Sequence, residues 1–189
     1  MNMLPLAFDF LLAVAVACIC IPWLRDAVEV SRTQVIDLPT NDNEEAEKAF
    51  LALLTEAEAE VVMYDDGDTN DGSLYMSQEV VRAIKDKLRE RPAFRVECVL
   101  NKRTGVTRFE TELAEEKNVR IRERRENPSR IHYKIIDGKK AYVSCHQFGN
   151  AARNRRIIDC TNALSRHAGQ RPLALQRYFN DFEKYAPAG

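Results

Sequence analysis

The stretch from Ile131 to Ser144 constrains the fold most, because it has the pattern of a β-hairpin. Residues 131–136 are mostly β-branched or aromatic, and residues 141–144 resume an extended pattern. Between them lies Asp137-Gly138, a dipeptide that favours a tight type I′ turn. The sequence therefore predicts two antiparallel strands joined at this turn.

Three cationic or titratable side chains fall on one face of the first strand, because side chains alternate along a strand: Arg130, His132 and Lys134. Apolar side chains occupy the other face. Positive groups stacked in this way repel one another unless an anion or an acidic side chain lies opposite, so a phosphate is a natural partner. The alternative is a charged strand face that only meets water.

The hairpin and the residues after it resemble a motif of the phospholipase D superfamily. That motif has His-x-Lys, four apolar positions, an Asp-Gly turn, a second strand and Gly-Ser-x-Asn-Phe. This chain offers His132-Tyr133-Lys134, then Asp137-Gly138, then Ser-Cys-His-Gln-Phe at 144–148 and a strand over 155–159. The resemblance covers about residues 45–186. It implies an α/β half-domain with a mixed, mainly parallel sheet flanked by helices.

The motif aligns in two ways, because only two residues separate Lys134 from Asp137 where the family has four. A two-residue deletion keeps His132 and Lys134 as the family's pair but moves them by roughly 6 to 7 Å along the strand. An alignment without gaps puts Arg130 at the family's histidine and His132 at its lysine. We favour the gapless alignment, because a deletion inside a central strand must shift its pairing or its turn.

The gapless alignment predicts a site that has lost its nucleophile. In the family, one histidine attacks the phosphorus and a second one protonates the leaving group, and no metal or other cofactor is implied. Arg130 cannot attack, because a guanidinium stays protonated and has no lone pair. The expected function is to bind phosphodiester ligands, either nucleic acid or anionic lipid, as a sensor or scaffold. The expected phosphate-binding residues are Arg130, His132, Lys134, Cys145 and Gln147.

The alternative is an active phosphodiesterase, nuclease or phospholipase. Its candidate catalytic residues are His132, Lys134 and Asp137. The family's active site needs two motifs facing each other, and this chain has one, so the resemblance implies a homodimer. A short chain with one motif and an apolar N-terminal run is similar in layout to the mitochondrial cardiolipin hydrolase and Zucchini group.

The charges are segregated along the chain. Residues 117–156 contain twelve lysines and arginines against three acids, whereas residues 42–71 contain eleven acids and one lysine. Such a positive surface attracts nucleic acid or anionic lipid headgroups, unless the acidic half of a neighbouring subunit compensates it. The residues expected to bind these ligands are Arg120, Arg122, Arg124, Arg153, Arg155 and Arg156.

Residues 4–24 form an apolar run broken only by Asp9, and its length predicts a transmembrane anchor. Arg25 and Arg32 follow it, which by the positive-inside rule places the domain in the cytoplasm, on a single-pass membrane protein. The alternative is a buried or partner-packing helix. The polar residues 25–43 are expected to form a juxtamembrane linker.

Residues 44–187 are expected to form one domain, since 189 residues suffice for one core of ordinary size. Their pattern alternates strands with helices, which favours a parallel arrangement of the first strands. The acidic loop Asp-Asp-Gly-Asp-Thr-Asn-Asp-Gly at 65–72 is not expected to bind calcium, because Asp71 replaces the required glycine and Ser77 the closing glutamate. Three cysteines in the domain without a CxxC pattern disfavour a disulfide framework or a zinc site.

Overall fold

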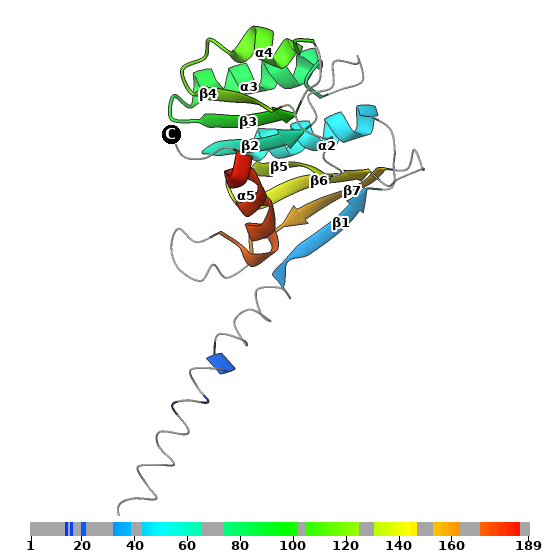
Figure 1. Cartoon of the computed structure of the whole chain (residues 1–189), viewed down its shortest axis with the longest axis vertical. Helices are drawn as coiled ribbons and strands as arrows, with labels where there is room; N and C mark the ends of the chain where they lie inside the picture. The colour runs from blue at the N-terminus through cyan, green and yellow to red at the C-terminus, as the bar shows by residue number, and fades with distance from the viewer. Residues whose placement is uncertain are drawn as a thin grey trace, which may run out of the picture.

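The computed structural model describes residues 14, 16, 20, 21, 32–38, 43–65, 74–101, 105–124, 131–146, 153–162 and 171–185. A seven-stranded sheet lies at its centre, in the order β1-β7-β6-β5-β2-β3-β4 (Figure 1). The strands are β1 (Gln34–Leu38), β2 (Glu60–Asp65), β3 (Arg95–Asn101), β4 (Val119–Arg124), β5 (Ile131–Ile136), β6 (Lys140–His146) and β7 (Arg153–Asp159). The helices that accompany the sheet are α2 (Asn43–Glu56), α3 (Gln78–Glu90), α4 (Arg108–Leu113) and α5 (Leu173–Tyr185).

The sheet is mixed, as expected, but it is not mainly parallel. Among the strands that the structure describes, only β2 with β3 and β3 with β4 pair in parallel. The other four described pairings are antiparallel. The reason lies in the connections: α3 and α4 carry the chain back between the first parallel strands, whereas a tight turn joins β5 to β6 and so reverses the chain direction.

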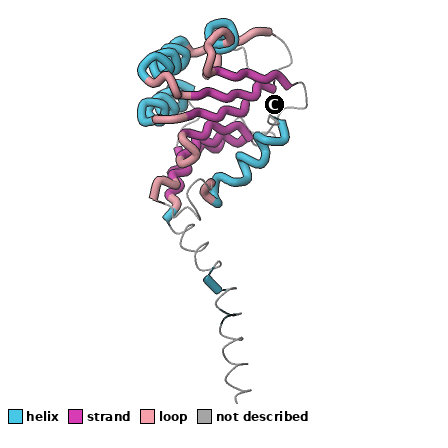
Figure 2. The backbone as a smooth tube through the Cα atoms, turned by 90° about the vertical axis from the view of Figure 1, so that its left-hand side faces the viewer, coloured by secondary structure: helices cyan, strands magenta, loops and turns pink. Residues whose placement is uncertain are grey.

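Helices cover the two faces of the sheet unequally. Figure 2 shows the helices of the first half on one face and α5 on the other. The larger core lies under α2, α3 and α4 and includes Phe50, Ile84 and Phe109. The smaller core lies under α5 and includes Tyr133 and Phe179. The sheet is therefore the middle layer of three.

Local signals explain the ends of the helices that position the site. The Ser77 hydroxyl oxygen accepts a hydrogen bond from the Val80 N–H at 3.2 Å and caps α3. Thr107 and Glu110 form a capping box at the start of α4. Both caps satisfy backbone N–H groups that a helix leaves unpaired at its first turn.

The hairpin turn has the predicted geometry. Asp137 and Gly138 both have positive φ, at 50° and 65°, which the type I′ turn requires at its two central residues. The Lys139 N–H donates to the Ile136 carbonyl at 2.9 Å and closes the turn. The prediction of a hairpin at this dipeptide is confirmed.

The structure corrects the expected N-terminal part of the fold. None of the helices in the described ranges is long and apolar enough to cross a membrane. The expected fold class was wrong to include an N-terminal transmembrane helix. Residues 4–24, on which that expectation rested, lie outside the described residues apart from 14, 16, 20 and 21.

Residues 25–43 are not only a linker, because β1 lies within them. β1 pairs antiparallel with β7, with Ile36 opposite Ile157 and Leu38 opposite Arg155. Four of its five residues are exposed, so it lacks the apolar alternation that identifies a half-buried strand. The sheet therefore begins at Gln34, ahead of the predicted domain boundary.

Candidate functional site

The candidate site lies on the α2–α4 face of the sheet, where β2 ends and β5 begins. Asp65 is the last residue of β2 and contacts both titratable side chains of β5 (residues 131–136). His132 Nδ1 lies 2.8 Å from Asp65 Oδ1. The Lys134 ammonium donates a hydrogen bond to Asp65 Oδ2 and forms an ion pair with it. One carboxylate therefore holds both members of the predicted His-x-Lys pair.

The β2–β5 register brings these residues together. Met63 lies opposite Lys134 and Tyr64 opposite Tyr133, so the next position places Asp65 opposite His132. Directly opposed residues in antiparallel strands point to the same face. The predicted shared face of His132 and Lys134 is confirmed, and its acidic partner comes from a strand that is distant in sequence.

The cluster is buried. The exposed fractions of the side chains are 2% for Lys134, 9% for His132 and 14% for Asp65. The Lys134 ammonium also lies 5.5 Å from the centre of the Tyr142 ring and 5.7 Å from that of Tyr75, within the range of cation–π attraction. An ammonium so enclosed needs a counter-charge, because its water shell is lost.

Burial and charge act in opposite directions on Asp65. Burial alone would raise the pKa of its carboxyl group, because the charged form loses its hydration. The charges of Lys134 and His132 and their hydrogen bonds outweigh burial and hold the pKa of Asp65 well below its usual range. Asp65 is therefore ionised at neutral pH and neutralises Lys134.

This arrangement orients the imidazole of His132. A carboxylate at Nδ1 favours the tautomer that carries its proton there and leaves the lone pair on Nε2. Such an imidazole has the chemistry of a general base or a nucleophile. In the described ranges, no group of three or more His, Cys, Asp or Glu side chains could hold a metal ion.

The predicted phosphate ligands are only partly described. Arg130 and Gln147 lie outside the described residues, and so does the side chain of Cys145. The register His132–Ser144–Arg155 runs across β5, β6 and β7, so these three share one face. Arg155, which was expected to bind nucleic acid or lipid, is 3% exposed there.

Asp137 lies at the opposite end of β5, five positions and roughly 17 Å along the strand from His132. Its carboxylate accepts hydrogen bonds from three consecutive backbone N–H groups, two just before β2 and one at its first residue. The distances are 2.7 Å from Glu58, 2.7 Å from Ala59 and 2.9 Å from Glu60. Asp137 thus joins the hairpin turn to the start of β2, and its placement gives no support to a catalytic role.

Replacing Asp137 with alanine is expected to lower the free energy of unfolding by about 2 to 3 kcal/mol, because three N–H groups lose a charged acceptor and alanine is disfavoured at positive φ. Asp137→Asn should cost less, since asparagine tolerates this φ and its one carbonyl oxygen can keep the bonds from Ala59 and Glu60. Urea unfolding of both variants measures the difference. Equal losses would contradict this role.

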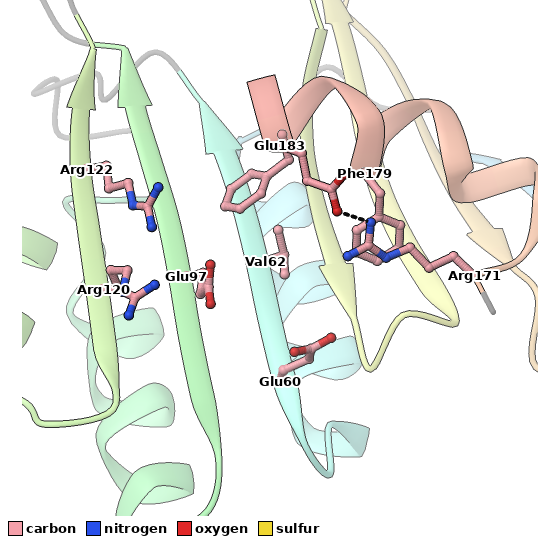
Figure 3. Close-up of a pocket in the computed structure, with 9 residues that line it drawn as sticks. Glu60, Val62, Glu97, Arg120, Arg122, Arg171, Phe179 and Glu183 are labelled. Atoms are coloured by element: carbon pink, nitrogen blue, oxygen red, sulfur yellow. Dashed lines mark hydrogen bonds and ion pairs between the residues drawn. The ribbon is translucent and has the colours of Figure 1, made fainter. Parts of the chain in front are cut away.

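The structure separates the predicted basic residues. Arg120 and Arg122 project from β4 on the α5 face, where they line a groove (Figure 3). Arg156 follows Arg155 along β7 and therefore points to the opposite face of the sheet, and its Nε lies 3.4 Å from Asp37 Oδ1. The side chains of Arg124 and Arg153 lie outside the described part. Arg120 and Arg122 therefore lie across the sheet from Lys134.

Sequence reasoning missed Asp65 as a site residue. It is the first residue of the acidic loop at 65–72 and was therefore grouped with that loop. The available signal was its position, since ligand-binding residues gather at the carboxyl ends of strands in α/β sheets. Residues 66–73, including the rest of this loop, lie outside the described residues.

Comparison with known proteins adds evidence on the fold. No family model matches the sequence, and no curated protein matches it. Solved structures do match. NucT from Helicobacter pylori has a TM-score of 0.53 and 13% identity, over 82% of this chain and 94% of its own. TrmBL2, an archaeal chromatin protein with a novel mode of DNA binding, has a TM-score of 0.50 and 12% identity, over 96% of this chain and 62% of its own.

A third similar structure is the phosphatidylserine synthase of Haemophilus influenzae Rd KW20, with a TM-score of 0.44 and 9% identity, over 80% of this chain and 45% of its own. The likeness to NucT and TrmBL2 shows the fold of this chain, and its mixed sheet flanked by helices agrees with the fold that the predicted resemblance implies. The loss of the nucleophile and the layout of the Zucchini group stay predictions.

Proposed function

We propose that this domain binds phosphodiester ligands near the Asp65–His132–Lys134 cluster without cleaving them. The observation that carries the proposal is the buried ion pair of Lys134 with Asp65. A lysine that holds a phosphate must offer its charge to the ligand, whereas this ammonium is already neutralised and only 2% exposed. The ion pair therefore disfavours a catalytic role for Lys134, and the proposal assigns the phosphate contacts to other residues.

The positive charge for binding would come from the basic segment around the hairpin. Residues 117–156 carry twelve lysines and arginines against three acids. Arg130 immediately precedes β5, the strand that carries His132. Because the structurally similar TrmBL2 binds DNA, single-stranded and double-stranded DNA are the first ligands to test. Anionic lipid is the alternative ligand.

The binding test uses the full chain and a fluorescent oligonucleotide. Arg130→Glu is expected to weaken binding at least about tenfold, and the affinity of the parent should fall steeply as salt rises, because phosphate contacts release counterions. Lys48→Glu is the charge-matched control, since Lys48 lies exposed on α2 and pairs with Glu44. Vesicles with anionic lipid form the second arm. No binding in either arm, or equal loss in the two variants, would refute the proposal.

A second candidate function is a phosphodiesterase that works as a homodimer. The observation that favours it is the 2.8 Å contact of His132 Nδ1 with Asp65, which orients the ring as a catalytic base or nucleophile requires. A single motif per chain would then need a partner copy. This candidate predicts metal-independent turnover of a bis-aryl phosphodiester, DNA, RNA or cardiolipin that is lost in His132→Ala, and twice the chain mass by light scattering. The binding proposal predicts no turnover of any of them.

A further inference from the structure

The groove on the α5 face has a volume of about 390 Å³ (Figure 3). It lies across the sheet from Asp65, because Glu60 and Val62 alternate with Met63 and Asp65 along β2. Its size is at the lower end of the range for small-molecule pockets, roughly 300 to 1,000 Å³. Its lining combines acidic and basic side chains with three apolar ones.

Four of the six charged residues in the groove already interact with other groups of the chain, Arg122 among them. Glu60 Oε2 lies 3.3 Å from the Arg95 guanidinium. Arg171 forms an ion pair with Glu183, and its guanidinium lies 4.0 Å from the centre of the Phe179 ring. This second pair closes the α5 side of the groove. The charge of Glu60, Arg171 and Glu183 is therefore compensated within the chain.

Glu97 and Arg120 are different. They are register partners on the parallel strands β3 and β4, and both project onto the groove face (Figure 3). Within the described ranges, neither side chain has a hydrogen bond or an ion pair, and Figure 3 marks no interaction between them. An acid and a base thus stand side by side, each available to a ligand.

Part of the groove lining is apolar. Val62, Phe179 and Phe182 are buried side chains of the smaller core, and their edges line the groove. A ligand that fits this surface carries an anion, a cation close to it and an apolar body. We propose that the groove binds a small zwitterion, an α-amino acid with an apolar side chain. Arg120 holds the carboxylate, Glu97 holds the ammonium, and the side chain lies against Phe179 and Phe182.

The test is calorimetric titration of the full chain with L-leucine and L-phenylalanine. Two matched analogues of leucine each lack one charge: isocaproate has no ammonium and isoamylamine has no carboxylate. Each analogue should bind at least about tenfold more weakly than leucine, because one charged partner in the groove is then left unpaired. Glu97→Gln and Arg120→Gln should weaken the binding of leucine by a similar factor.

Arg82→Gln and Glu115→Gln are the control variants, since both side chains are exposed and lie outside the groove lining. They should bind leucine as the parent does. The proposal is overturned if neither amino acid binds at about 10 mM. It is also overturned if isocaproate binds as tightly as leucine, or if an oligonucleotide occupies the groove and is released by Arg120→Gln. Arg130→Glu, which tests the phosphodiester site, should not change leucine binding.

Discussion

Replacing Lys134 with methionine is expected to lower the free energy of unfolding by about 3 to 5 kcal/mol. Methionine keeps most of the apolar stem but removes the ammonium. Asp65, whose side chain is 14% exposed, is then left as a largely buried carboxylate without its main counter-charge. Urea unfolding at neutral pH, followed by circular dichroism, measures the loss.

Two further variants show whether burial of the charge is the cause. Lys48→Met removes an exposed ion pair, with side chains 68% and 73% exposed, and should cost less than about 1 kcal/mol. The double variant Asp65→Asn/Lys134→Met removes both charges and should be more stable than the two single losses added together predict. If Lys134→Met costs no more than Lys48→Met, the buried ion pair is not a major contribution to stability.

Local patterns in the sequence predicted the hairpin. The β-branched and aromatic run over residues 131–136 coincides with β5, Ile131–Ile136. The turn at Asp137-Gly138 could be predicted because its positive φ angles depend on those two residues alone. These signals act over a few residues, so no tertiary context was needed to recognise them.

Pairing between distant strands could not be predicted in the same way. β1 joins β7 across more than a hundred residues, and its exposed side chains leave no apolar pattern. The partner of Lys134 is Asp65, 69 positions away, and only the β2–β5 register brings them into contact. Alternation placed His132 and Lys134 on one face, but it could not identify the carboxylate opposite them.

Charge along the sequence also does not determine charge on a surface. Arg120 and Arg122 were grouped with Arg155 because all three belong to one basic segment. In the structure they lie on opposite faces of the sheet, because the parity of β4 relative to β7 depends on how the strands pair. The basic segment was expected to form one positive surface. Instead, Arg120 and Arg122 line a groove on one face of the sheet, and Arg155 is buried on the other face.

Asp65 occupies the position at which an anion would meet His132 and Lys134, and removing its carboxylate should therefore create an anion site. In Asp65→Ala, the Lys134 ammonium loses its carboxylate, and the space which that group filled becomes open to an anion. The variant should be less stable than the parent in sodium chloride, because a buried ammonium is left without its counter-charge. Inorganic phosphate should restore part of that stability by binding to Lys134.

The expected result is a Tm that rises with phosphate in Asp65→Ala and changes little in the parent, at constant ionic strength. Phosphate at about one hundred times its Kd would stabilise the variant by about 2.7 kcal/mol. Asp86→Ala is the control, because Asp86 pairs with Arg89 on the exposed face of α3, and its response to phosphate should equal that of the parent. If phosphate stabilises parent and Asp65→Ala equally, Asp65 does not stand in for an anion. The pairing of Lys134 would then no longer support binding without cleavage.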